Sequence, residues 1–70
     1  MSLEALLRTV TAEIAAAERR TAEQARATSQ RIAAGESSVE DERALYLELD
    51  RLTLLRCRQW ALEEMCRVPA

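Results

Sequence analysis

The sequence predicts an all-α protein: an antiparallel hairpin of two long helices joined by a short turn. Apolar residues recur at spacings of three and four along both halves of the chain, which is the helical period. The only glycine, Gly35, lies near the middle and is followed by helix-capping residues. In residues 39–66 no two-residue alternation, the period of a strand, extends over more than a few residues. We therefore expect one domain over residues 1–70, with helices at about 2–34 and 38–67 and a turn at 35–37.

The first helix has a start signal and a single apolar seam. Ser2 is suited to the N-cap, and Glu4 falls in the first turn, where the helix dipole favours a negative charge. The seam has the three-and-four spacing of helix-on-helix packing. Its expected residues, widened by Leu6, are Leu3, Leu7, Val10, Ile14, Ala17, Thr21, Ala25, Thr28 and Ile32.

The turn is predicted by residues that end one helix and start the next. Gly35 suits the left-handed position that follows many helices. Ser37 and Glu40 have the spacing of a capping box, in which each side chain bonds the other's backbone. A connection of about three residues makes the two helices antiparallel neighbours.

The second helix carries apolar residues on several sides, whereas an ordinary surface helix has one apolar stripe. At 100° per residue, the stripe expected to face the first helix is Leu45, Leu49, Leu52, Leu55, Leu62 and Cys66. The second stripe, near the opposite side, is Leu47, Leu54, Ala61 and Met65. The third, mixed stripe is Tyr46, Thr53, Cys57 and Trp60.

Folding the hairpin about the turn pairs one helix with the other and leaves the second stripe uncovered. Small residues oppose large ones, as interdigitated packing requires, although Ile14 meets the polar Gln59. The other expected pairs are Ala25 with Leu49, Thr21 with Leu52, Ala17 with Leu55, Val10 with Leu62, and Leu7 with Cys66.

An uncovered apolar stripe predicts an interface, because a contiguous exposed apolar patch marks a binding surface. A second copy would complete a four-helix bundle with coiled-coil packing, and another protein would serve equally. Trp and Arg are favoured interface residues. Trp60 has the alternative of capping the open end of the hairpin, and the arginines that of simple hydration. The predicted partner-binding residues are Tyr46, Leu47, Arg51, Leu54, Arg58, Trp60, Ala61 and Met65.

Several classes of function are disfavoured by composition. The chain lacks histidine, the usual catalytic base and zinc ligand, and one glycine cannot build a phosphate-binding loop. We therefore expect no enzyme activity, cofactor, metal site or small-molecule substrate. Its net charge of −2, with mixed signs, disfavours nucleic acid, including a DNA-linked regulator. No apolar window is long enough to span a membrane, and the N-terminus lacks the pattern of a signal peptide.

The cysteines and arginines bear on the compartment and the source. Cys57 and Cys66 lie about 13 Å apart along one helix, too far for a disulfide within the chain. We expect both to be reduced packing residues of a cytoplasmic protein. All ten basic residues are arginine, which suggests a GC-rich bacterium or its phage. A phage protein would act in the host cytoplasm.

A Gly ends the first helix in Ala34-Gly35, Tyr46 lies early in the second helix, and Leu52-Thr53-Leu54-Leu55 forms a late apolar run. In this outline and in length, the chain resembles the small helical-hairpin co-chaperones of type III secretion needle subunits. It departs from them where Leu45 and Leu47 flank the tyrosine in place of the family's frequent glutamines. The resemblance implies a cytoplasmic protein that joins a larger helical-repeat chaperone to hold a needle subunit and prevent premature polymerisation.

Three functions follow from these observations. The first is a non-enzymatic binding module that sequesters or inhibits another protein through the second helix, as a homodimer. The second is the secretion co-chaperone, which acts in a heteromeric complex. The third is a phage-encoded inhibitor of a host regulator. All three need an apolar surface with a rim of charge, so the sequence alone leaves the partner and the relative orientation of two hairpins open.

Overall fold

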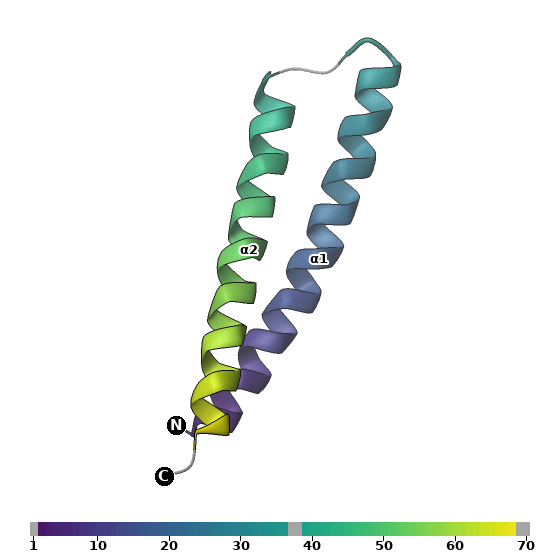
Figure 1. Ribbon diagram of the computed structural model, residues 1–70. Coiled ribbons are helices and arrows are strands. Elements are labelled where there is room, and N and C mark those ends of the chain that lie inside the picture. Colours follow the sequence, from purple (N-terminus) through teal and green to yellow (C-terminus); the bar gives the residue numbers. More distant parts are fainter. Residues whose placement is uncertain (1, 37–38, 69–70) are drawn as a thin grey trace.

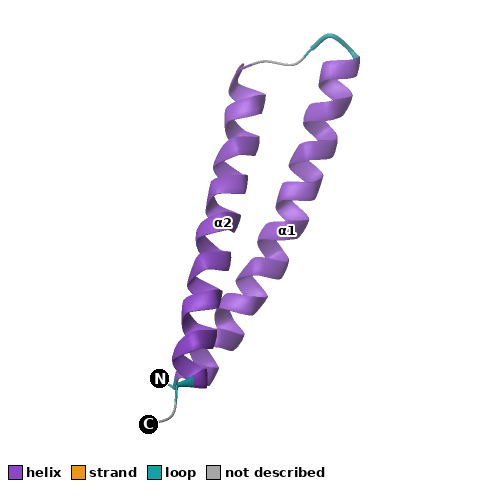
Figure 2. Cartoon of the chain, in the orientation of Figure 1, coloured by secondary structure: helices purple, strands orange, loops and turns teal. Residues whose placement is uncertain are grey.

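The computed structural model describes residues 2–36 and 39–68 and contains two helices packed side by side (Figure 1). Helix α1 runs over Leu3–Ala33 and helix α2 over Val39–Arg67. Figure 2 shows that nearly all of the described chain is helical. The predicted hairpin is therefore confirmed. The backbone spans 56 × 16 × 15 Å, which is a rod only two helices thick.

The ends of α1 are fixed by the residues expected there. The hydroxyl of Ser2 accepts a hydrogen bond from the backbone N–H of Ala5 at 3.0 Å, which satisfies one free donor of the first turn. Gly35 has a φ of 72°, in the left-handed region. The N–H groups of Gly35 and Glu36 donate to the carbonyls of Ile32 and Arg31 at 3.0 and 2.7 Å, the pattern of a Schellman motif. The predicted capping box begins at Ser37, which lies outside the described residues.

The core is a single line of side chains along the middle of the hairpin. It consists of the buried Val10, Ile14, Ala17, Leu52 and Leu62, with Leu6, Leu7 and Leu55 packed against it. These residues come from the predicted seam of α1 and the first predicted stripe of α2. A two-helix rod has one internal interface, so this line is all the apolar burial available to the hairpin by itself.

Toward the turn, the contact line departs from the expected one. Ala25, Ile32 and Leu49 were predicted to lie in the seam but are exposed. The polar Gln24 and Glu48 are half-buried in their place. The reason is geometric: the buried line keeps the strict seven-residue repeat of a coiled coil, whereas Ala25, Ile32 and Leu49 each fall one position later.

Ion pairs join the helices along this polar part of the seam. Arg31 Nε lies 3.1 Å from Asp41 Oδ2, and Arg20 Nε lies 3.6 Å from Glu48 Oε2. The arginines are about half exposed, while the two carboxylates are mostly covered. Partly exposed pairs of this kind add little stability but fix which residues lie opposite each other. None of the described helices is long and apolar enough to cross a membrane.

Two buried hydroxyls weaken the seam. The Oγ1 atoms of Thr21 and Thr28 make no hydrogen bond within the described parts of the chain. The other threonine hydroxyls that donate, such as that of Thr9, bond the carbonyl four residues earlier. A buried polar group without a partner costs about 1–3 kcal/mol, so the seam forgoes stability at both positions.

We predict that Thr28→Val raises the free energy of unfolding by about 1 kcal/mol, because valine keeps the shape and removes the unsatisfied hydroxyl. Urea denaturation followed by circular dichroism at one fixed protein concentration measures the change. The matched control is Thr9→Val, at an exposed position, which should leave stability nearly unchanged. A loss of stability in Thr28→Val would show that the hydroxyl is satisfied in solution.

Candidate functional site

The outer face of α2, turned away from α1, is the candidate site. Leu52 and Leu62 are buried in the seam, and Leu54 lies about 200° around the helix from Leu52. Leucines therefore occur on opposite sides of α2, and one neighbouring helix covers only one of them. The apolar residues that remain uncovered follow the helix over most of its length.

All eight predicted partner-binding residues are exposed in the hairpin. Leu47 and Leu54 keep 69% and 70% of their surface accessible, and Trp60 keeps 65%. Such values are typical of side chains that make no tertiary contact. We define the outer face by residues of α2, with Val68 directly after it, that are not buried against α1. They are Val39, Arg43, Tyr46, Leu47, Asp50, Thr53, Leu54, Cys57, Trp60, Ala61, Glu64, Met65 and Val68. Arg51 and Arg58 lie at its rim.

Most charged side chains on and beside the outer face form no ion pair within the described parts of the hairpin. Arg43, Asp50, Arg51 and Arg58 form no ion pair with another described residue. Glu64 is the exception, since its Oε1 lies 2.9 Å from Arg67 Nη1, one turn along α2. Arg51 and Arg58 lie at the edge of the face as a polar rim, whereas Arg43 and Asp50 lie between its apolar residues.

Trp60 forms one wall of an open groove on α2. The groove has a volume of about 570 Å³ and is lined by Thr53, Arg56, Cys57, Trp60 and Ala61. All five come from the same side of one helix, so the groove is a shallow depression beside the indole rather than an enclosed pocket. With its ring mostly exposed, Trp60 does not cap the open end of the hairpin.

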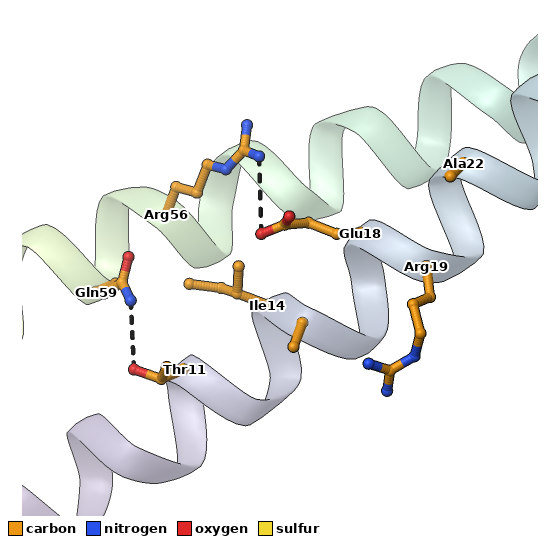
Figure 3. A pocket seen from close by; sticks show the side chains of 8 residues that line it. Thr11, Ile14, Glu18, Arg19, Ala22, Arg56 and Gln59 are labelled. Atoms are coloured by element: carbon orange, nitrogen blue, oxygen red, sulfur yellow. Dashed lines mark hydrogen bonds and ion pairs between the residues drawn. The ribbon is translucent and has the colours of Figure 1, made fainter.

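A second groove, between the helices, was not predicted from the sequence. It has a volume of about 760 Å³, and Figure 3 shows the side chains that line it. Gln59 Nε2 donates to Thr11 Oγ1 at 3.3 Å at one end, and Arg56 Nη2 lies 3.9 Å from Glu18 Oε1 farther along (Figure 3). The only sequence signal is the small Ala15 and Ala22, one turn either side of Glu18. Its lining residues are Thr11, Ile14, Ala15, Glu18, Arg19, Ala22, Arg56 and Gln59.

This inter-helix groove is open to solvent, and Arg56 and Gln59 already have partners within the hairpin. The Gln59 contact also resolves the expected mismatch with Ile14, because the amide turns to the edge of the seam while Ile14 stays buried. Across residues 2–36 and 39–68, no three His, Cys, Asp or Glu side chains come together as metal ligands would.

The cysteines differ from expectation. Cys57 and Cys66 were predicted to be packing residues, but both are exposed free thiols. Cys57 lies on the outer face, where α1 does not reach. Cys66 keeps its seam position, but it lies in the last turn of α2, and the facing Leu7 is itself only half-buried. Few atoms of α1 remain there to cover the thiol.

We predict that Leu62→Ala lowers the free energy of unfolding much more than Leu54→Ala does, because Leu62 lies in the seam and Leu54 lies on the outer face. Leu62→Ala leaves a cavity in the core and should cost about 2–5 kcal/mol of unfolding free energy. Leu54→Ala removes an exposed side chain and should cost less than about 0.5 kcal/mol. The comparison is made by thermal or urea unfolding at a concentration where the chain sediments as a monomer. Equal losses would place Leu54 inside the fold.

Comparison of the chain with protein-family models, with curated proteins and with solved structures found no match in any of the three. Any function of the outer face has therefore to be inferred from the residues of this chain alone.

Proposed function

We propose that this chain is a non-enzymatic helical-hairpin module that binds protein through the outer face of α2. A second copy is the simplest partner, and two hairpins would make a four-helix assembly with the α2 helices in contact. The observation that carries the proposal is the exposure of Leu47, Leu54, Trp60 and Met65 along one helix. Their large apolar surfaces gain about 25 cal/mol for each Å² that binding removes from water.

The small apolar core of the hairpin supports the same proposal. Five buried apolar residues form the whole core of the described chain, and two buried threonines in the seam add unsatisfied hydroxyls. A chain of this size with so small a core is marginal by itself and is usually completed by a partner, a metal or disulfides. A partner that binds only the folded form stabilises it by mass action.

A module of this kind acts by keeping its target bound on the outer face. While the outer face is covered by a target helix, that helix is withheld from its other contacts, which is how a sequestering or inhibiting protein works. Trp60 and Tyr46 supply large aromatic contacts, and Arg51 and Arg58 supply charges at the rim that select acidic partners. The co-chaperone and the phage inhibitor are special cases with a dedicated partner, and a chain that orders only with a second protein would favour them over self-association.

We predict that Leu54→Glu abolishes self-association while the chain stays soluble and helical, because a charge would have to be buried at the centre of the interface. Sedimentation or light scattering measures the mass, with circular dichroism as the measure of helix content. The matched control is Gln30→Glu, an exposed position on α1. If the unaltered chain has the mass of a dimer and Leu54→Glu keeps it, the outer face is not the interface.

We also predict that self-association slows the chemical modification of Cys57 and leaves that of Cys66 unchanged. Both thiols are exposed in the single hairpin, so maleimide should modify Cys57 and Cys66 readily in dilute solution. At higher concentration Cys57, on the outer face, should react several-fold more slowly, whereas Cys66, on the seam side, should be unaffected. Mass spectrometry of the labelled peptides gives both rates in one sample, and parallel changes at the two sites would contradict the assignment.

A further inference from the structure

Apart from Met65, which follows Arg51 and Arg58 at the same spacing, the outer face of α2 is built from three parallel lines of residues with seven-residue spacing. Seven residues make nearly two helical turns, so each line runs almost straight along the helix. The aromatic line is Val39, Tyr46, Thr53 and Trp60. The charged line, about 40° away, is Arg43, Asp50, Cys57 and Glu64. The leucine line, about 40° farther on, is Leu47, Leu54, Ala61 and Val68. All of these residues are exposed except Glu64, which is half-buried.

We propose that the outer face binds a second copy of this chain with the two α2 helices antiparallel, about a two-fold axis beside Thr53 and Leu54. This inference rests on the proposed function and adds the partner's orientation and register. Between antiparallel helices related by a two-fold axis, each line runs beside its own copy in the reverse direction. The aromatic lines then meet along one edge, the leucine lines along the other, and the charged lines run between them.

In this register Arg43 faces an opposite charge, and Leu47 faces a smaller residue. Arg43 lies opposite Glu64 of the second copy, and the two-fold axis makes that ion pair twice. On the leucine edge, Leu54 packs against its own copy on the axis, and Leu47 packs against the small Ala61. On the aromatic edge, Tyr46 packs against Trp60. Opposite charges and a large residue over a small one are what a specific helix interface needs.

The parallel arrangement lacks the charge pairing. It places each residue of the charged line beside its own copy, so Arg43, Asp50 and Glu64 would each meet a like charge. The aromatic line of one helix would run beside the leucine line of the other, so Trp60 would lie near Ala61 and volume does not separate the two orientations. The outer face therefore favours the antiparallel orientation through charge. Arg51 and Arg58 lie outside the leucine line, where they stay hydrated in either case.

The native Cys57 provides a direct test of the register. In the antiparallel dimer, Cys57 lies opposite Asp50 of the second copy and is separated from the other Cys57 by about seven residues of helix rise, roughly 10 Å. A disulfide needs Cα atoms within about 7 Å. Asp50→Cys, in a Cys66→Ser background, should therefore give a covalent dimer through the introduced thiol and Cys57 when treated with oxidised glutathione. The two positions are too far apart on one helix to bridge within a chain.

The matched control is Cys66→Ser alone, which keeps Cys57 as the only thiol and should give little covalent dimer. Non-reducing electrophoresis, with mass spectrometry of the linked peptides, reads out both variants. A rapid link between two Cys57 residues in the control would overturn the antiparallel register and indicate the parallel one. A dimer by sedimentation in which Asp50→Cys fails to cross-link would also overturn it, although self-association would stand. A chain that stays monomeric at every concentration would overturn self-association as well.

A charge exchange tests the same register without cross-linking. Arg43→Glu and Glu64→Arg should each raise the dissociation constant of the dimer about tenfold or more, and the double variant should recover most of that loss. Arg26→Glu, on α1 and outside the interface, should change it little. Because Glu64 also pairs with Arg67 in its own chain, recovery in the double variant is the decisive result. Additive losses in the double variant would contradict the register.

Discussion

The constraint on which this protein depends is that α2 has apolar residues on opposite sides while the hairpin supplies one neighbouring helix. Leu52 and Leu62 are buried against α1, and Leu47 and Leu54 on the far side keep more than two thirds of their surface exposed. No rotation of α2 about its axis would cover both sets, because they differ by about half a turn. The two described helices therefore leave a face of α2 that neither of them covers.

The seam between the helices sets their register and provides only a small apolar core. Its apolar part is a short line centred on Val10, Ile14 and Leu62, and toward the turn polar residues take over. The unsatisfied hydroxyls of Thr21 and Thr28 subtract from a small total. Under the proposed function, binding at the outer face would be coupled to folding of the hairpin, since a partner that covers α2 only in the folded form favours that form.

Much of the fold follows from the sequence, because its signals are local. Ser2 and Gly35 act through backbone geometry that a few neighbouring residues determine, and both have the roles expected of them. The contact line was harder to predict near the turn. Ala25 and Leu49 look like seam residues because they are apolar, yet the coiled-coil repeat places Gln24 and Glu48 there instead. In a seam this narrow, the seven-residue repeat decides which residues face the other helix. An apolar residue one position away from the repeat stays outside the seam.

The exposure of the second stripe of α2 was predictable for the same reason, since one neighbouring helix covers only one side of α2. The sequence did not reveal that Cys57 and Cys66 are exposed, because a cysteine is equally compatible with a core and a surface. Self-association through the outer face is tested by the mass of the unaltered chain, measured by sedimentation equilibrium over a wide range of concentrations. We expect a dimer at high concentration that dissociates on dilution. A well-ordered monomer throughout, with Leu47, Leu54 and Trp60 in water, would contradict it.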